Sequence, residues 1–273
     1  MNSYNITDPN DPLIRDFLSL NNHQKRQERE RPGGDMDKSF LAEGDQVIER
    51  AIKTGHDLLT LVVDASRKKP LPTWIPKTAT ILFCGEPVIL AISGRSSIRD
   101  PIGSFVRPTP LKFSDAIKSA NTVVVTENVT NPTNMGALFR NASALDADLV
   151  CIDSASCDPL YRRSVRVSMG QVFKTNHARI PDFEKGLDEL ESSGFLRVGL
   201  TPDSSANDIS EMELDEDTPV ALLVGAEQTG LTTATLKKCD YRFRIPMSKD
   251  VDSLNVATAM AVALHATREA RRR

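Results

Sequence analysis

Residues 218–265 read TPVALLVGAEQTGLTTATLKKCDYRFRIPMSKDVDSLNVATAMAVALH. The apolar run from Val220 to Val224 is short and β-branched, which predicts a buried strand. The loop GAEQTGL follows at 225–231, with two glycines and a carboxylate, and a second short strand, Tyr241 to Ile245, stops at Pro246. Two strand ends that lead into small or polar loops predict a ligand crevice at the edge of an α/β sheet.

Size and composition are those of an ordinary globular protein. The chain has 273 residues, of which 40% are hydrophobic and 26% charged, with a formal net charge of −3. This length suits two modest domains. The four cysteines show no CxxC spacing and the four histidines are scattered, so we expect no metal site. The sequence has no N-terminal signal-like run and no 18-residue apolar span, so we expect a soluble cytoplasmic protein without a membrane segment.

Composition shifts divide the chain into four parts. Residues 1–37 are polar and rich in charge, proline and glycine, and we interpret them as an arm or linker. Residues 38–108 alternate strand and helix patterns, including a helix from Asp45 to Lys53, and predict a small α/β domain. Residues 109–120 are expected to link this domain to a second one at 121–273.

The second domain alternates strands and helices with crossover-length connections, so its sheet should be mainly parallel. Asn131 and Pro132 are a good N-cap and first residue for its first helix. The expected strands are 122–126, 149–152, 196–200, 220–224 and 241–245, and the expected helices are 132–145, 182–192 and 253–271.

Polar residues follow the predicted strands, where ligands sit in open α/β sheets. They are Glu127, Asn128, Asn131, Asn134, Thr201, Glu227, Ser253 and Asn255, together with Gly225 and Ala226. The set lacks a histidine base, paired carboxylates, a Walker lysine and a GxGxxG loop, which disfavours hydrolase triads, phosphoryl transfer and dinucleotide binding. Such a crevice could bind a small polar cofactor through backbone groups. Taken singly, Asn131, Asn134, Arg140, Glu227 and Ser253 are each better explained as caps or surface groups.

Three segments together resemble the SpoU/TrmH family of RNA ribose 2′-O-methyltransferases. NPTNMGALFRNA at 131–142 resembles the first family motif, VGAEQTGL at 224–231 the second, and IPM at 245–247 through SLNVATA at 253–259 the third. RVSMGQVF at 166–173 is similar to a lesser segment. The resemblance covers about residues 120–270, and the order and spacing of three motifs make it a strong signal.

The resemblance implies a particular architecture. The family fold is an α/β-knot, in which the C-terminal chain threads through a loop to form a deep trefoil knot. More weakly, FLAEG at 40–44 and the helix after it resemble the L30e-like substrate-binding domain that precedes the catalytic domain in many members. Family members are typically homodimers with active sites completed across the interface.

The resemblance also implies a cofactor and site residues. S-adenosylmethionine would bind in the knot through Thr201, Gly225, Ile245, Leu254 and Asn255. The catalytic set, carried over by position, would be Arg140, Asn134, Glu227, Ser253 and Asn255. Arg140 matches the family arginine described as the base or as the group that stabilises the forming alkoxide. Because arginine is nearly always protonated, our hypothesis is that Arg140 fixes the phosphate and lowers the pKa of the attacking hydroxyl.

The implied substrate is RNA. The L30e-like domain favours ribosomal RNA, while a transfer RNA and a non-catalytic RNA-binding or assembly role on the same fold remain alternatives. Because the chain is acidic overall, its positive charge must be concentrated near the site. The expected RNA-facing residues are Arg67, Lys68, Lys69, Arg107, Arg162, Arg163 and Arg166, with the C-terminal arginines 268–273 emerging into solvent.

Overall fold

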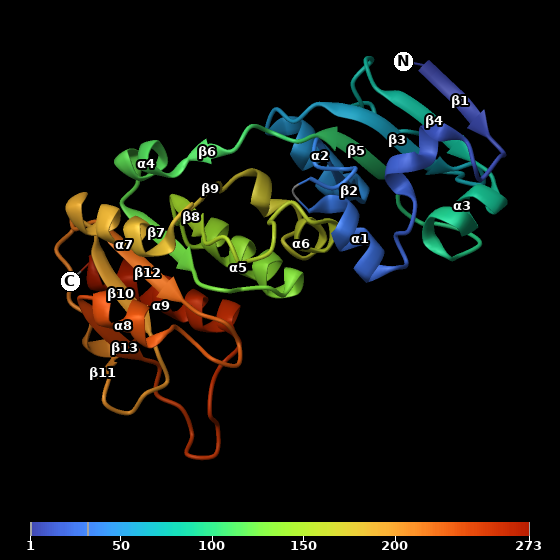
Figure 1. The fold of residues 1–273 in the computed structure, drawn as a ribbon. Coiled ribbons are helices and arrows are strands. Elements are labelled where there is room, and N and C mark those ends of the chain that lie inside the picture. The colour runs from blue at the N-terminus through green and yellow to red at the C-terminus, as the bar shows by residue number, and fades with distance from the viewer. Residues whose placement is uncertain (1, 32, 273) are drawn as a thin grey trace. The chain divides into compact units, whose positions relative to one another are not determined.

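The computed structural model describes residues 2–31 and 33–272. The chain forms two compact units (Figure 1). The N-terminal unit comprises Met1–Thr109 with Leu160–Phe173, and the C-terminal unit comprises Pro110–Pro159 with Lys174–Arg273. Both units combine strands and helices, which confirms the α/β class.

The N-terminal unit is built on a mixed five-stranded sheet in the order β1-β4-β3-β5-β2. The pairs β1–β4 and β3–β4 are parallel, whereas β3–β5 and β2–β5 are antiparallel. The strands are β1 Asn2–Ile6, β2 Ser39–Glu43, β3 Leu58–Asp64, β4 Thr80–Cys84 and β5 Ile102–Val106. Its helices are η1 Pro12–Phe17, α1 His23–Glu30, α2 Asp45–Lys53, α3 Glu86–Ser93, α6 Arg162–Val167 and η3 Gln171–Phe173. The helix predicted from Asp45 to Lys53 is present with those bounds.

The first 37 residues differ from the arm or linker that the composition predicts. β1 pairs along its length with β4, so the N-terminal segment is part of the sheet and not a linker outside it. Ile14 and Phe17, on η1, are fully buried in the core of this unit. The prediction from composition was wrong because β1 is an edge strand with mostly exposed side chains. A few buried apolar residues are enough to anchor a polar segment.

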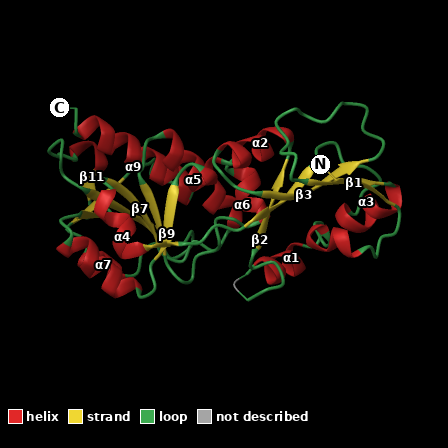
Figure 2. Ribbon diagram, turned by 90° about the horizontal axis from the view of Figure 1, so that it is seen from above, coloured by secondary structure: helices red, strands yellow, loops and turns green. Residues whose placement is uncertain are grey.

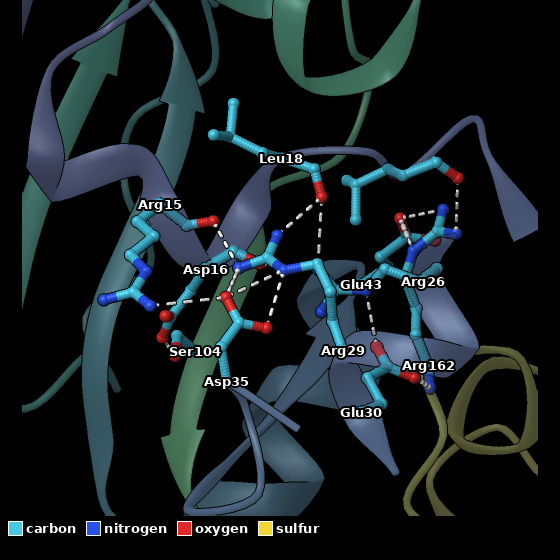
Figure 3. A network of polar contacts seen from close by, with 11 residues as sticks. Arg15, Asp16, Leu18, Arg26, Arg29, Glu30, Asp35, Glu43, Ser104 and Arg162 are labelled. Carbon is cyan, nitrogen blue, oxygen red and sulfur yellow. Dashed lines mark hydrogen bonds and ion pairs between the residues drawn. The ribbon is translucent and has the colours of Figure 1, made fainter. Parts of the chain in front are cut away.

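A network of charged side chains holds these N-terminal residues in the unit (Figure 3). The guanidinium of Arg26 and the carboxylate of Glu30 are both buried and pair at 2.6 Å, while Arg26 also donates to the carbonyl of Asp16 at 2.7 Å. Glu30 accepts the main-chain N–H of Arg162 at 3.0 Å, and the Arg162 side chain donates to Glu43 at 2.7 Å. The segment Leu160–Phe173 is thereby bound to α1 and β2.

Several residues predicted to face RNA are ion-paired within this unit. Arg67 and Lys69 both bind the carboxylate of Asp45, at 3.2 and 2.8 Å. Arg162 and Arg166 both pair with Glu43. The positive charge of these four side chains is therefore partly balanced by carboxylates, and their role in binding RNA stays a prediction.

The C-terminal unit is an eight-stranded sheet in the order β11-β13-β10-β12-β7-β8-β9-β6, with every neighbouring pair parallel. This confirms the parallel sheet that the strand–helix alternation predicts. Five strands match the predicted ones: β7 Thr122–Thr126, β8 Leu149–Ile152, β10 Leu196–Leu200, β12 Val220–Val224 and β13 Tyr241–Arg244. Three short strands were not predicted: β6 Leu111–Lys112, β9 Asn176–Arg179 and β11 Asn207–Asp208.

Helices cover both faces of this sheet, α5 and α9 on one side and α4 and α7 on the other (Figure 2). The central strands β7 and β12 are buried throughout, which explains their uniformly apolar or β-branched sequences. The helices and 3-10 turns are α4 Phe113–Ala116, η2 Ile117–Ser119, α5 Pro132–Ala144, α7 Phe183–Ser192, η4 Ile209–Glu211, α8 Thr233–Lys238 and α9 Val256–Ala270. Asn131 caps α5 as predicted, by accepting the N–H of Thr133.

The last helix differs from its prediction at both ends. It begins at Val256, capped by Asn255, so Ser253 lies in the loop before it. Beyond it, Arg271 folds back: its guanidinium donates to the Thr122 hydroxyl at 2.7 Å and to the Thr218 carbonyl at 2.8 Å. Arg271 therefore fastens the chain end to β7 and to the segment before β12. The expectation that residues 268–273 emerge into solvent is wrong for Arg271, and Arg273 lies outside the described residues.

Candidate functional site

A pocket of about 550 Å³ lies beyond the carboxyl ends of β10, β12 and β13. We call it the strand-end pocket. Its walls come from the loop after each of these strands, from residues 252–254 and from the start of α9. Six residues predicted for the site line it: Thr201, Gly225, Glu227, Ile245, Ser253 and Leu254. The sheet thus gathers at one edge residues from three separate parts of the sequence, as parallel strands do.

The loop after β12 is closed tightly on itself at Gly225. The N–H of Gly230 donates to the carbonyl of Ala226 at 2.9 Å. A side-chain carbon on Gly225 would lie 2.1 Å from the main chain of Gly230 and 2.3 Å from the nitrogen of Leu231. Only glycine fits at position 225, because the main chain of the same loop already occupies the space.

A buried arginine joins β10 to the residue that directly precedes the neighbouring strand β13. Arg197 on β10 is 5% exposed and binds Asp240 through Nε at 3.1 Å and Nη2 at 3.0 Å. Hydrogen bonding to Arg197 is the largest cause of a lowered pKa of the Asp240 carboxyl, and the Asp240 bond likewise raises the pKa of Arg197. At the other end of β10, the N–H of Thr201 donates to the Phe243 carbonyl at 3.0 Å, which places Thr201 in the pocket wall.

A second hollow of about 320 Å³ adjoins the first, and we call it the side pocket. The loop 226–229 lines both pockets, so the two pockets share this wall. The opposite wall of the side pocket comes from residues 128–131 and from Asn134 on α5. Its lining is rich in amides and hydroxyls: Asn128, Thr130, Asn131, Asn134, Gln228 and Thr229.

The predicted residues Asn134 and Asn255 are brought together, although 121 positions separate them. The Nδ2 of Asn255 donates to the Oδ1 of Asn134 at 2.9 Å. The Oδ1 of Asn255 accepts the main-chain N–H groups of Ala257 and Thr258, at 3.0 and 3.4 Å, and so caps α9. One side chain therefore links the first motif to the start of the last helix.

Glu127, at the end of β7, has a definite role that the sequence did not assign. It is 8% exposed and accepts three hydrogen bonds, from the N–H and the hydroxyl of Thr232, both at 2.9 Å, and from the hydroxyl of Thr235 at 2.8 Å. Thr232 also caps α8. Glu127 thereby fixes the far end of the loop that separates the two pockets. The available signal was a carboxylate placed directly after a buried strand.

Arg140 is the predicted residue that the fold does not bring to the site. It is exposed on α5 and lines neither the strand-end pocket nor the side pocket. Its assigned part in the reaction stays a prediction. Over residues 2–31 and 33–272, no group of three or more His, Cys, Asp or Glu side chains is arranged to hold a metal ion, and no helix is long and apolar enough to cross a membrane.

Fold and site define a class: a parallel α/β domain with a ligand pocket at its strand ends, preceded by a small α/β domain. Residues 121–265 match the SpoU rRNA Methylase family. Over 262 residues the chain is 35% identical to an uncharacterized tRNA/rRNA methyltransferase of Mycobacterium tuberculosis, covering 95% of this chain and 90% of the relative. The chain belongs to the SpoU family of RNA methyltransferases. The sequence resemblance is thus confirmed, and with it the α/β fold class; membership of the family implies the knot.

Solved structures agree over nearly the whole chain. An AdoMet-bound rRNA methyltransferase from Sinorhizobium meliloti is similar with a TM-score of 0.78 and 26% identity, over 98% of both chains. A crystal structure described as an RNA 2′-O ribose methyltransferase is similar with a TM-score of 0.73 and 26% identity, over 99% of this chain and 100% of that one. The small α/β domain is therefore shared as well as the SpoU domain.

Proposed function

We propose that this protein transfers a methyl group from S-adenosylmethionine to a ribose 2′-hydroxyl of ribosomal RNA. The observation that carries the proposal is the strand-end pocket, which the second and third family motifs line together, while the first motif lines the adjoining side pocket. The similarity to the Sinorhizobium rRNA methyltransferase supports ribosomal RNA over transfer RNA. A transfer RNA substrate is the alternative, since the mycobacterial relative is described as a tRNA/rRNA methyltransferase.

The residues of the strand-end pocket suit S-adenosylmethionine. Its wall combines apolar side chains, including Ile245 and Leu254, with the close main chain at Gly225. A heterocyclic ring would pack on the apolar part, and Thr201 and Ser253 offer hydroxyls to polar groups of the ligand. When bound, the cofactor supplies an electrophilic methyl group. Asn255, at the rim of this region, would hold its neighbours in place through the α9 cap.

We assign to Arg140 the task of fixing the RNA phosphate beside the attacking ribose. Its guanidinium can bind a phosphate bidentately and stabilise negative charge on the hydroxyl oxygen as the proton leaves. Because Arg140 lies outside the pocket of its own chain, we propose that the protein is a homodimer. In that dimer Arg140 of each protomer serves the pocket of the other. Asn134, Glu227 and Ser253 would then orient RNA and cofactor at the shared site.

Mapping of 2′-O-methyl sites in ribosomal RNA, from cells with and without this protein, tests the proposed substrate. One site should lose its methyl group when the protein is absent and regain it when purified protein and S-adenosylmethionine are added. A loss confined to transfer RNA would favour the alternative substrate. Calorimetry with S-adenosylmethionine separates both from a non-catalytic RNA-binding protein, which would bind no cofactor.

A further inference from the structure

The amide of Asn134 has a feature that the methyl-transfer site does not account for. Its side chain is 5% exposed, and its Nδ2 has no hydrogen-bond partner among the described residues. A buried donor without a partner costs free energy, so such groups in native proteins point to a ligand or a bound water. Asn134 lines the side pocket and not the strand-end pocket.

The orientation of the Asn134 amide is fixed by Asn255, which lies 121 positions away in the sequence. Asn255 must present its Oδ1 to the N–H groups of Ala257 and Thr258 to cap α9, so its Nδ2 is the atom that faces Asn134. The acceptor atom of the Asn134 side chain is its Oδ1, and Asn134 therefore turns Oδ1 toward the Nδ2 of Asn255. The Nδ2 of Asn134 is left as a donor of fixed direction. Asn255 is thus a positioning residue for Asn134.

The lining of the side pocket indicates what kind of group accepts this hydrogen bond. None of its lining residues is basic or aromatic, and Glu227 adds a carboxylate to its wall. A phosphate would meet negative charge there and no cation. Amides and hydroxyls instead suit the neutral, hydrogen-bonding edge of a nucleobase, and enzymes that act on single nucleotides extrude the base into such pockets.

We propose that the side pocket receives the base of the methylated nucleotide, with an acceptor atom on its edge bound by Nδ2 of Asn134. The inference rests on the proposed function, because the attached ribose would lie by the shared loop 226–229, between base and methyl donor. The site would thereby select the target by its base as well as by the RNA fold. The base must present an oxygen or an unprotonated ring nitrogen to the Nδ2 of Asn134.

The test uses free nucleosides, which need no methyl transfer. The full-length protein is saturated with S-adenosylhomocysteine, so that the strand-end pocket is filled, and titrated with adenosine, guanosine, cytidine and uridine. The side-chain NH₂ signals of ¹⁵N-labelled protein report binding. We expect at least one nucleoside to shift the Asn134 signal. Asn134→Asp replaces the donor by an acceptor. It should lower the affinity for that nucleoside about tenfold or more.

Two further variants separate positioning from general damage. Asn255→Asp keeps the α9 cap, since aspartate caps helices well, but it cannot donate a hydrogen bond to Asn134. It should therefore lower the affinity for the nucleoside several-fold. Asn141→Asp is the matched control: Asn141 also lies on α5 and donates to α9, at the Ala257 carbonyl, but lines neither pocket. It should leave nucleoside affinity unchanged.

Three outcomes would overturn the inference. They are the absence of binding by any nucleoside to the wild-type protein, equal binding by Asn134→Asp, and a loss of S-adenosylhomocysteine affinity in Asn134→Asp with nucleoside binding intact. The last outcome would assign the amide to the cofactor. Failure of the proposed function would look different, because it would appear as absent methyl transfer to RNA whatever the nucleoside titrations give.

Discussion

The carboxylate of Glu127 accepts both the main-chain N–H and the hydroxyl of Thr232, each at 2.9 Å. These two residues belong to distant parts of the chain: Glu127 directly follows β7, and Thr232 follows the loop that comes after β12. Their bonds hold the end of that loop, whose residues 226–229 line both pockets. We therefore expect ligand binding at this loop to depend on Glu127, although Glu127 lines neither pocket.

Glu127→Ala should destabilise the fold and lower the affinity for the cofactor. Thr232 and Thr235 would lose their acceptor in a buried setting, which costs about 1–3 kcal/mol of unfolding free energy. Urea denaturation measures this loss, and calorimetry should show lower affinity for S-adenosylmethionine. Glu216→Gln, at an exposed carboxylate, is the control and should change neither quantity. Unchanged cofactor affinity in Glu127→Ala would show that the loop holds its shape by itself.

Gly225→Ala should strongly weaken cofactor binding while the secondary structure is kept. The added carbon meets main-chain atoms at 2.1 Å, which no rotamer change can relieve, so the loop must shift into or away from the pocket. We expect the dissociation constant for S-adenosylmethionine to rise by about tenfold or more, consistent with a strain of about 1–3 kcal/mol. In Gly85→Ala, the control, the new carbon meets nothing nearer than 3.8 Å, and affinity should hold. Normal affinity in Gly225→Ala would contradict the crowding seen here.

Asp240→Asn should make the protein less stable and less sensitive to acid. The pKa of Asp240 is lowered by Arg197, so this carboxylate contributes stability above the ordinary aspartate pKa and loses it as the pH falls below about 4. Because Asp240 is partly exposed and Arg197 keeps Glu191, we expect a loss of about 1–2 kcal/mol near neutral pH.

Urea unfolding at a series of pH values measures both effects. The stability of the wild type should fall more steeply than that of Asp240→Asn as the pH drops below 4. The two curves should converge at low pH, where the wild-type carboxyl is protonated and residue 240 carries no charge beside Arg197 in either protein. Parallel curves would show that the pair does not contribute to acid sensitivity.

Arg140→Ala should leave cofactor affinity unchanged and lower the rate of RNA methylation by about two orders of magnitude, the usual effect of removing one charge-stabilising donor. Arg140→Lys keeps the charge but loses the bidentate geometry, and should also be impaired. Calorimetry and methyl incorporation into ribosomal RNA measure the two quantities. A normal rate in Arg140→Lys would remove Arg140 from the centre of the reaction.

Mixing two inactive variants tests whether sites are completed between protomers. Arg140→Ala and Gly225→Ala each spoil one half of the proposed shared site. In a mixed dimer, the intact pocket of the first meets the intact Arg140 of the second. Random exchange of protomers should therefore restore about a quarter of wild-type activity in the symmetric dimer we propose. No recovery, with mixed dimers shown to form, would place Arg140 and the pocket in one protomer.

The sequence by itself determined the strands and helices of the C-terminal unit that carry strong patterns. β7, β10 and β12 are buried runs of apolar and β-branched residues, and Asn131 with Pro132 marks the start of α5. The short strands β6, β9 and β11 were not predicted, because a stretch of two to four residues is too short to show a hydrophobic period. β1 was missed for the same reason: its identity as a strand comes from pairing with β4, not from its own residues.

The family motifs in the sequence also identified the residues of the candidate site, but only the tertiary structure decided how they act together. Spacing along the chain says nothing about which side of an amide faces which neighbour. The fold sets Asn255 between the α9 main chain and Asn134, and it turns Glu127 onto Thr232. It also leaves Arg140 exposed on α5, away from both pockets. Hydrogen bonds between residues more than a hundred positions apart depend on the packing of whole strands and helices, and no local pattern encodes them.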